Sequence, residues 1–324
     1  MTPPAIATPQ HLRRSAILFL AIGLLIFATL YWGSERLTYR TGHANALYKI
    51  ATLAPGPVDW VILGASHAMP LDFDGFNDHM QQETGLRIVN LASPGTGPLY
   101  NRFVLEHFLA THRAGNLLYV VDSFAFDARD WNEDRFADNK LLARTPFDID
   151  TAERLTWYCL HQGVDPLALL DYVTGFSKLN NRDRFDRDVW VGETQFERNY
   201  RTSVTAERQR IAYLYPGGTP ATAVQDRYLA QFDAIIELAR HYGMRVVAIK
   251  LPVPARFRAQ LPGETQFDAR LSQLLARRGM PLYDLSAMLD KPGLYLDTDH
   301  LNRAGVTALF DQSLKQILEG ARSE

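Results

Sequence analysis

The feature that most constrains the fold is an apolar run that ends abruptly in a turn of small residues. Residues 58–67 read VDWVILGASH, and every side chain before Gly64 except Asp59 is apolar. Such a run is typical of a central parallel strand, which is buried on both faces. Because the small residues permit a tight turn into a helix, we expect Ser66 at the carboxyl edge of the sheet, where open α/β sheets bind ligands.

The turn at Ser66 has two interpretations. Glycine and serine in a strand-to-helix turn often serve turn geometry and helix capping alone. The other end of the chain favours a chemical role, because residues 295–302 read YLDTDHLN and place Asp297 three residues before His300. A hydroxyl, an imidazole and a carboxylate together make an activated nucleophile. We therefore interpret Ser66, His300 and Asp297 as a candidate catalytic triad.

Four further apolar runs predict four further strands. They lie at residues 86–92, 116–123, 244–252 and 281–286, and helical patterns separate them. Alternating strands and helices are typical of right-handed βαβ units. The sequence therefore predicts an α/β fold, a flavodoxin-like three-layer sandwich with a central, mostly parallel five-stranded sheet.

An N-terminal apolar segment predicts a membrane helix. Residues 16–33 contain no charge and are just long enough to cross a hydrocarbon core, with Tyr31 and Trp32 suited to its interface. We expect an uncleaved anchor at residues 15–33, with residues 1–14 in the cytoplasm. The protein would then be single-pass in the inner membrane, with its domain in the periplasm or outside the cell. A cleaved signal peptide is the alternative, although no Ala-x-Ala site follows the apolar run.

The rest of the chain is expected to divide into a linker at residues 34–57 and a domain at residues 58–324, with an insertion at about 124–220. Aromatic and charged residues alternate in the insertion without a strand pattern. It is interpreted either as a lid or glycan-binding element with stacking faces such as Trp131 and Trp190, or as a segment with a small core of its own.

Composition excludes several classes of function. The net charge of −2 over 324 residues gives no basic surface for nucleic acid. The single cysteine excludes an intramolecular disulfide and a cysteine-rich metal site. No helical His-x-x-x-His or other clustered ligand set is present, so neither a metal nor another cofactor is expected.

The candidate triad resembles that of the SGNH/GDSL hydrolase superfamily, and the resemblance covers most of residues 58–324. Gly64-Ala65-Ser66 is similar to the family's first block, with alanine where aspartate is common, and residues 297–300 match its final Asp-x-x-His block. The resemblance implies that Ser66 is the nucleophile and that its N–H group contributes to the oxyanion hole.

Two later blocks bear on the rest of that oxyanion hole. Gly95, in the sequence ASPG, looks similar to the glycine that donates to the oxyanion in the family's second block. The third block, usually Gly-x-Asn, is replaced here by Asp122-Ser123. The resemblance then implies Ser123 as the remaining donor, and an ionised Asp122 nearby would oppose the developing negative charge.

The span followed by such a domain resembles the accessory proteins of polysaccharide O-acetylation and teichoic-acid D-alanylation. This resemblance implies an acyl-ester donor, a polysaccharide acceptor and a membrane-bound O-acyltransferase as partner. Three further residues are candidates for substrate binding. His67 either lines the acceptor site or caps the helix, while Lys250 and Arg256 either hold an anionic sugar or are ordinary solvated charges.

These observations predict a membrane-anchored serine acyl-transfer enzyme, an O-acetyltransferase or O-acetylesterase acting on a cell-envelope or secreted polysaccharide. Transfer to water and transfer to sugar use the same triad, so both reactions stay open. A catalytically weak glycan-binding or scaffold subunit of a membrane-bound O-acyltransferase system is the alternative from another class. A lipase or thioesterase on a membrane tether is a third.

Overall fold

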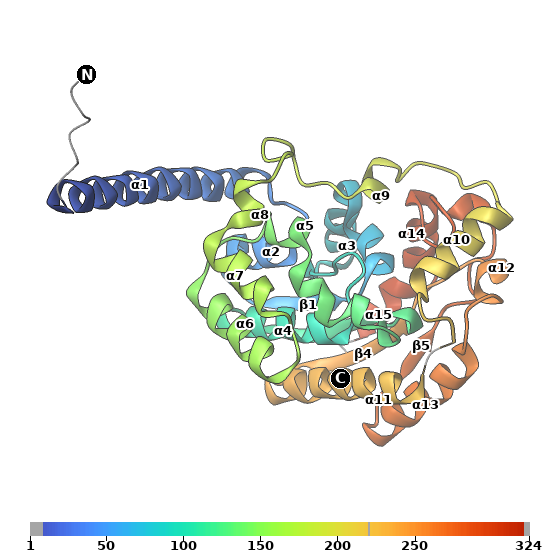
Figure 1. The fold of residues 1–324 in the computed structure, drawn as a ribbon. Helices are drawn as coiled ribbons and strands as arrows, with labels where there is room; N and C mark the ends of the chain where they lie inside the picture. Colours follow the sequence, from blue (N-terminus) through green and yellow to red (C-terminus); the bar gives the residue numbers. More distant parts are fainter. Residues whose placement is uncertain (1–8, 220, 321–324) are drawn as a thin grey trace.

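The computed structural model, which describes residues 9–219 and 221–320, contains one five-stranded parallel sheet (Figure 1). Its strand order is β2-β1-β3-β4-β5, and all four pairings are parallel. The strands are Val58–Leu63 (β1), Ile88–Asn90 (β2), Ala114–Val120 (β3), Arg245–Lys250 (β4) and Leu282–Asp284 (β5). The predicted α/β fold is confirmed, and the carboxyl ends of all five strands meet at one edge of the sheet.

The central strand β1 is buried on both faces, as its composition requires. Val61 and Leu63 belong to one apolar cluster, while Trp60 and Ile62 belong to the cluster on the opposite face. All four side chains are fully buried, and each burial of a large apolar side chain contributes about 1.5–3 kcal/mol. The sheet is therefore the middle layer between two cores.

Helices cover both faces of the sheet and give the three layers. On the first face lie α4 (Pro98–Thr111), α11 (Thr222–His241) and α13 (Glu264–Arg277). On the second lie α3 (Phe76–Thr84), α14 (Arg303–Leu309), the π-helical η6 (Phe310–Leu314) and α15 (Lys315–Glu319). Short elements complete these layers: the 3₁₀ helices η1 (Ser66–Gly75) and η5 (Pro292–Leu294), and α12 (Ala255–Arg258).

Between β3 and α11, the described residues form short helices joined by loops and contain no strand. Its elements are η2 (Ser123–Phe126), η3 (Arg129–Trp131), η4 (Glu133–Ala137), α5 (Asn139–Leu142), α6 (Ile149–His161), α7 (Pro166–Thr174), α8 (Phe176–Leu179), α9 (Val191–Thr194) and α10 (Val204–Leu214). Phe136 and Tyr158 pack edge-on against Phe103 of α4. The first part of this segment thus extends the main core and does not form a core of its own.

The N-terminal helix α1 (Pro9–Thr41) is one continuous element that projects from the domain (Figure 1). It is the one helix among the described residues that is long and apolar enough to span a membrane, with a mean hydropathy of 2.2 over its most apolar window. The expected linker at residues 34–57 is partly helical, because α1 continues to Thr41 and α2 (Ala46–Thr52) follows, capped by Asn45. Residues buried against the domain hold this part of α1: Ser34, Thr38 and Thr41.

Candidate active site

The nucleophile candidate follows the end of β1 directly. Gly64 has a φ of +153°, and a β-carbon there would lie 2.9 Å from Cβ of Val120 on β3, so the close approach of the two strand ends requires glycine. Ser66 then begins the 3₁₀ helix η1, and only 5% of its surface is exposed. The turn therefore places the hydroxyl at the carboxyl edge of the sheet.

Ser66, His300 and Asp297 lie in one chain of hydrogen bonds. The Ser66 hydroxyl donates to Nε2 of His300 at 2.8 Å, and Nδ1–H of His300 donates to the Asp297 carboxylate at 2.9 Å from Oδ2. The loop before α14 fixes this geometry, because Asp297 also accepts from the backbone N–H of His300 at 2.9 Å. The structure brings the three predicted residues together.

The electrostatics of Asp297 suit this arrangement. Burial alone would raise the pKa of Asp297, but its interaction with His300 more than offsets burial and lowers that pKa below the usual value. The carboxylate is therefore ionised near neutral pH and can accept from Nδ1–H. This fixes the tautomer that leaves Nε2 free to accept the serine proton.

The loop that carries Gly95 is attached to the turn that carries Ser66. Thr96 Oγ1 donates to the backbone oxygen of Gly64 at 3.1 Å, and the Ser93 N–H donates to the same oxygen at 3.4 Å. Gly95 has a left-handed φ of +63°, and a β-carbon would meet the Trp131 ring at 2.9 Å. Glycine is required here, and the loop lies beside the nucleophile as the oxyanion interpretation needs.

Ser123 lies in a polar cluster of its own. Its hydroxyl is hydrogen-bonded to Tyr215 Oη at 2.7 Å and to the carboxylate of Glu264. Because a hydroxyl has one proton, Ser123 can donate to an oxyanion only by giving up its bond to Glu264. The proposed oxyanion hole therefore depends on the backbone N–H groups of Ser66 and Gly95.

A second buried network, centred on His67, lies beside the triad. His67 Nδ1 is 2.6 Å from Asp122 Oδ1, and its Nε2 is 3.0 Å from Asp299 Oδ2. Arg210 Nε donates to both oxygens of Asp299, at 3.1 and 2.8 Å. His67 does not cap η1, since both of its ring nitrogens are bound to carboxylates. The expected conflict between Asp122 and an oxyanion is reduced, because Asp122 is paired with His67.

The charges in this network stabilise one another. Burial lowers the pKa of His67, but Asp122 and Asp299 outweigh burial and raise that pKa to about 10. Burial raises the pKa of Asp299, but Arg210, His300 and His67 hold it well below the usual range. His67 is therefore an imidazolium at neutral pH, and its two N–H groups both donate.

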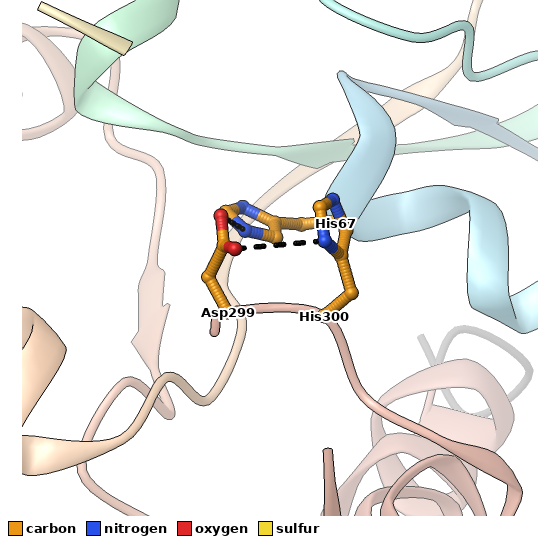
Figure 2. Close-up of side chains that lie close together, drawn as sticks. All are labelled: His67, Asp299 and His300. Carbon is orange, nitrogen blue, oxygen red and sulfur yellow. Dashed lines mark hydrogen bonds and ion pairs between the residues drawn. The ribbon is translucent and has the colours of Figure 1, made fainter. Parts of the chain in front are cut away.

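His67, Asp299 and His300 also form a compact group of possible metal ligands, with one ligand atom from each within 4.8 Å of the others (Figure 2). The hydrogen bonds argue against this use. Arg210 occupies both oxygens of Asp299, and the ring nitrogens of both histidines already have partners in Ser66, Asp297, Asp122 and Asp299. A cation would have to displace a neighbouring guanidinium.

The predicted sugar-binding cations differ in their surroundings. Lys250 is buried at the end of β4, where its ammonium group binds Glu264 and, at 2.6 Å, Asp268. These carboxylates outweigh burial and raise the pKa of Lys250. Lys250 thus presents no free ammonium for an anionic sugar. Arg256 is half-exposed and lies 3.2 Å from Glu207.

A hollow near the site is lined in part by Trp190. The Trp190 ring packs edge-on against His300, with centroids 5.1 Å apart. The hollow is open to solvent, has a volume of about 370 Å³ and also borders Pro94, Lys140, Arg144 and Arg187. Its lining does not include a triad residue, so Trp190 connects it to His300, and it reaches α5 at Lys140.

Asp299 and Arg210 were not predicted as site residues from the sequence, and Trp190 was predicted only as a stacking face of the insertion. Asp299 was visible as the second aspartate of Asp-x-Asp-His, but nothing in that spacing says which aspartate orients the histidine. Arg210 and Trp190 come from α10 and the start of α9, where no local pattern connects them to residues 66 or 300.

Comparison with known proteins gives weak similarities. No protein-family model matches the sequence, and no curated protein matches it significantly. A GDSL-like lipase from Bacteroides thetaiotaomicron aligns at a TM-score of 0.43 and 10% identity, over 86% of this chain and 98% of that one. A protein from Bacteroides fragilis, described as a candidate acylhydrolase, aligns at a TM-score of 0.41 and 11% identity, over 83% and 94%. Alignments this weak do not carry the function of those proteins over to this chain.

Proposed function

We propose that this protein is a membrane-anchored serine acyl-transfer enzyme, an O-acetyltransferase or O-acetylesterase that acts on a cell-envelope or secreted polysaccharide. The observation that carries the proposal is the chain of hydrogen bonds from Ser66 through His300 to Asp297, 2.8 and 2.9 Å long, at the carboxyl edge of the sheet. A buried serine that serves only turn geometry needs no imidazole oriented by a carboxylate.

In the first step, Oγ of Ser66 attacks the carbonyl carbon of an acyl ester while Nε2 of His300 takes the serine proton. The N–H groups of Ser66 and Gly95 would donate to the resulting oxyanion. The C–O bond to the donor's alcohol then breaks, and His300 returns the proton to that alcohol. Asp297 stays ionised and stabilises the imidazolium.

In the second step, an acceptor hydroxyl attacks the acyl carbon of the acyl-serine and loses its proton to Nε2 of His300. A sugar hydroxyl gives an acylated polysaccharide, and water gives a free acid. Either way the Oγ–C bond breaks and Ser66 recovers its proton. The hollow beside Trp190 supports a sugar acceptor, because an indole face and polar side chains together are suited to a pyranose.

The anchor supports the setting of this reaction. A span within α1 would keep the domain at the inner membrane and facing the periplasm or the exterior, where a membrane-bound O-acyltransferase could supply acyl groups. Both this partner and the polysaccharide acceptor belong to the proposal.

The test is turnover of p-nitrophenyl acetate by the full chain in detergent, with and without a bare oligosaccharide whose products are weighed by mass spectrometry. We expect turnover that Ser66→Ala and His300→Ala abolish and that Ser313→Ala, a serine outside the site, retains. Acetylated sugar would identify a transferase, and free acetate alone an esterase. A folded wild-type chain that is inert, even with a membrane-bound acyltransferase present, would replace this proposal by the scaffold alternative.

A further inference from the structure

Exposed apolar side chains are concentrated in one short part of the domain. Among the described residues outside α1, thirteen large apolar side chains are exposed, and eight of these lie between residues 147 and 176. Six of the eight are named here the anchor-side apolar face: Phe147, Ile149, Leu167, Leu170, Val173 and Phe176. A cluster of this kind marks an interaction surface, whereas single exposed apolar residues need no explanation.

The spacing along α7 directs this face outward from one side of the helix. Leu167, Leu170 and Val173 recur at intervals of three residues, so they share one side. The opposite side of α7 supplies Ala168 and Tyr172 to the main core. The helix is therefore apolar on its outer side as well as its core side, whereas a helix that faces water is amphipathic and has a polar outer side.

The face adjoins the point where α1 leaves the domain. Tyr31 of α1 packs edge-on against Phe147, with centroids 6.3 Å apart, and Glu35 pairs with Lys178 of α8. Gly175, between α7 and α8, has a φ of +65°, and a β-carbon there would lie 2.5 Å from the Tyr31 ring. Figure 1 shows α7 and α8 on the side of the domain from which α1 projects.

The apolar part of α1 ends beside the anchor-side apolar face. Residues 16–33 cover about 27 Å at a rise of 1.5 Å per residue, close to the thickness of a hydrocarbon core. Tyr31 and Trp32 at the end of this stretch are suited to the lipid headgroup region. Because Tyr31 contacts Phe147 and lies against Gly175, a bilayer that contains α1 would have its headgroups beside the face.

We infer that the anchor-side apolar face inserts into the headgroup region of the bilayer and gives the chain a second membrane contact beside α1. The inference depends on the proposed anchor. Exposed acidic residues border the face, including Asp150 and Glu153, so the contact is made by apolar insertion and not by attraction to anionic lipids. Two contacts fix the orientation of the domain, and the hollow beside Trp190 then extends toward the membrane side, since it borders α5 and α5 contacts α8.

The test measures lipid contact at single positions in the full chain. In a Cys159→Ser background, a fluorophore is attached to one introduced cysteine at a time: Leu170→Cys in the face, Leu24→Cys within the span, or Val204→Cys on α10. Val204 is the matched control, because it is also an exposed apolar residue, 49% exposed against 58% for Leu170. The proteins are placed in phosphatidylcholine nanodiscs with one of two quencher lipids: one carries the quencher just below its headgroup, and the other near the end of its acyl chain to report on Leu24→Cys.

We expect quenching at Leu170→Cys and at Leu24→Cys that is several-fold greater than at Val204→Cys, and unchanged in high salt. Quenching at Leu24→Cys but not at Leu170→Cys would overturn the inference and leave the anchor in place. The same result is expected if a second copy of the chain covers the face, and it overturns the inference in that case too. Absence of quenching at Leu24→Cys would overturn the anchor itself.

Discussion

Two buried histidines lie side by side in the candidate active site, with ring centroids 4.8 Å apart, and their partners give them opposite properties. His300 has a carboxylate on one ring nitrogen and the Ser66 hydroxyl on the other. His67 has a carboxylate on each nitrogen. His300 can therefore accept a proton from a nucleophile, while His67 already holds both of its protons.

This difference shows that a histidine and an aspartate in contact do not by themselves make a catalytic pair. The group on the second ring nitrogen decides the role. A hydroxyl there can be deprotonated, whereas a second carboxylate keeps the imidazole protonated at neutral pH. We expect substitutions around His300 to reduce activity more than stability. Substitutions around His67 should do the reverse.

The largest expected effect is that of Ser66→Ala on activity. Loss of the nucleophile removes the covalent route, and comparable triads lose about 10⁴- to 10⁶-fold in kcat. Ester hydrolysis and melting temperature should be measured together. Ser66 has only 5% of its surface exposed, and removal of its hydroxyl leaves only a small void, so the fold should be kept. Activity within tenfold of the wild type would exclude Ser66 as the nucleophile.

Asp297→Asn comes next and has a matched control in Asp299→Asn. The amide at position 297 would favour the wrong tautomer of His300 and lower kcat by about 10³- to 10⁴-fold. Because the Asp297 side chain is 35% exposed and that of Asp299 is fully buried, Asp297→Asn should cost less stability than Asp299→Asn. Kinetics and denaturation of both variants check this. A larger loss of kcat for Asp299→Asn would reverse the assignment of the two aspartates.

His67→Gln should mainly reduce stability. The substitution leaves the buried carboxylate of Asp122 without its cationic partner and removes one of the two cationic partners of Asp299. Breaking a buried ion pair in this way costs about 3–5 kcal/mol. Denaturation monitored by tryptophan fluorescence measures this loss. A stable variant with a normal melting temperature but a large loss of kcat would instead place His67 in the chemistry.

The part of the site that could be predicted from the sequence is the part encoded locally. The strand before Ser66 follows from an apolar run, and the pairing of Asp297 with His300 follows from their spacing in one loop. The His67 network could not be predicted in this way, because His67, Asp122, Arg210 and Asp299 come from four distant segments. Only the order of the strands and the path of α10 bring them together.

The helical segments show the same limit. Proline and glycine at residues 54–57 separate α2 from β1, but α2 itself has only seven residues and depends on packing and the Asn45 cap. In the expected insertion, alternating aromatic and charged residues gave no clear period. Which aromatics join the core, such as Tyr158, and which apolar residues stay exposed, such as Leu170, depends on neighbours far along the chain.

The smallest expected effect, taken per pH unit, is the pH dependence that separates the two histidines. The pKa of His67 is raised from 6.5 to about 10 in the folded chain, so its contribution to stability is complete below pH 6.5 and is lost as the pH rises through 10. One proton limits the slope to about 1.4 kcal/mol per pH unit. The quantity to measure is the difference in unfolding free energy between wild type and His67→Gln, because titrations common to both chains cancel. This difference should shrink steadily between pH 6.5 and 10. A difference that stays constant over that range would mean that His67 is neutral in the folded chain, and the contrast with His300 would then fail.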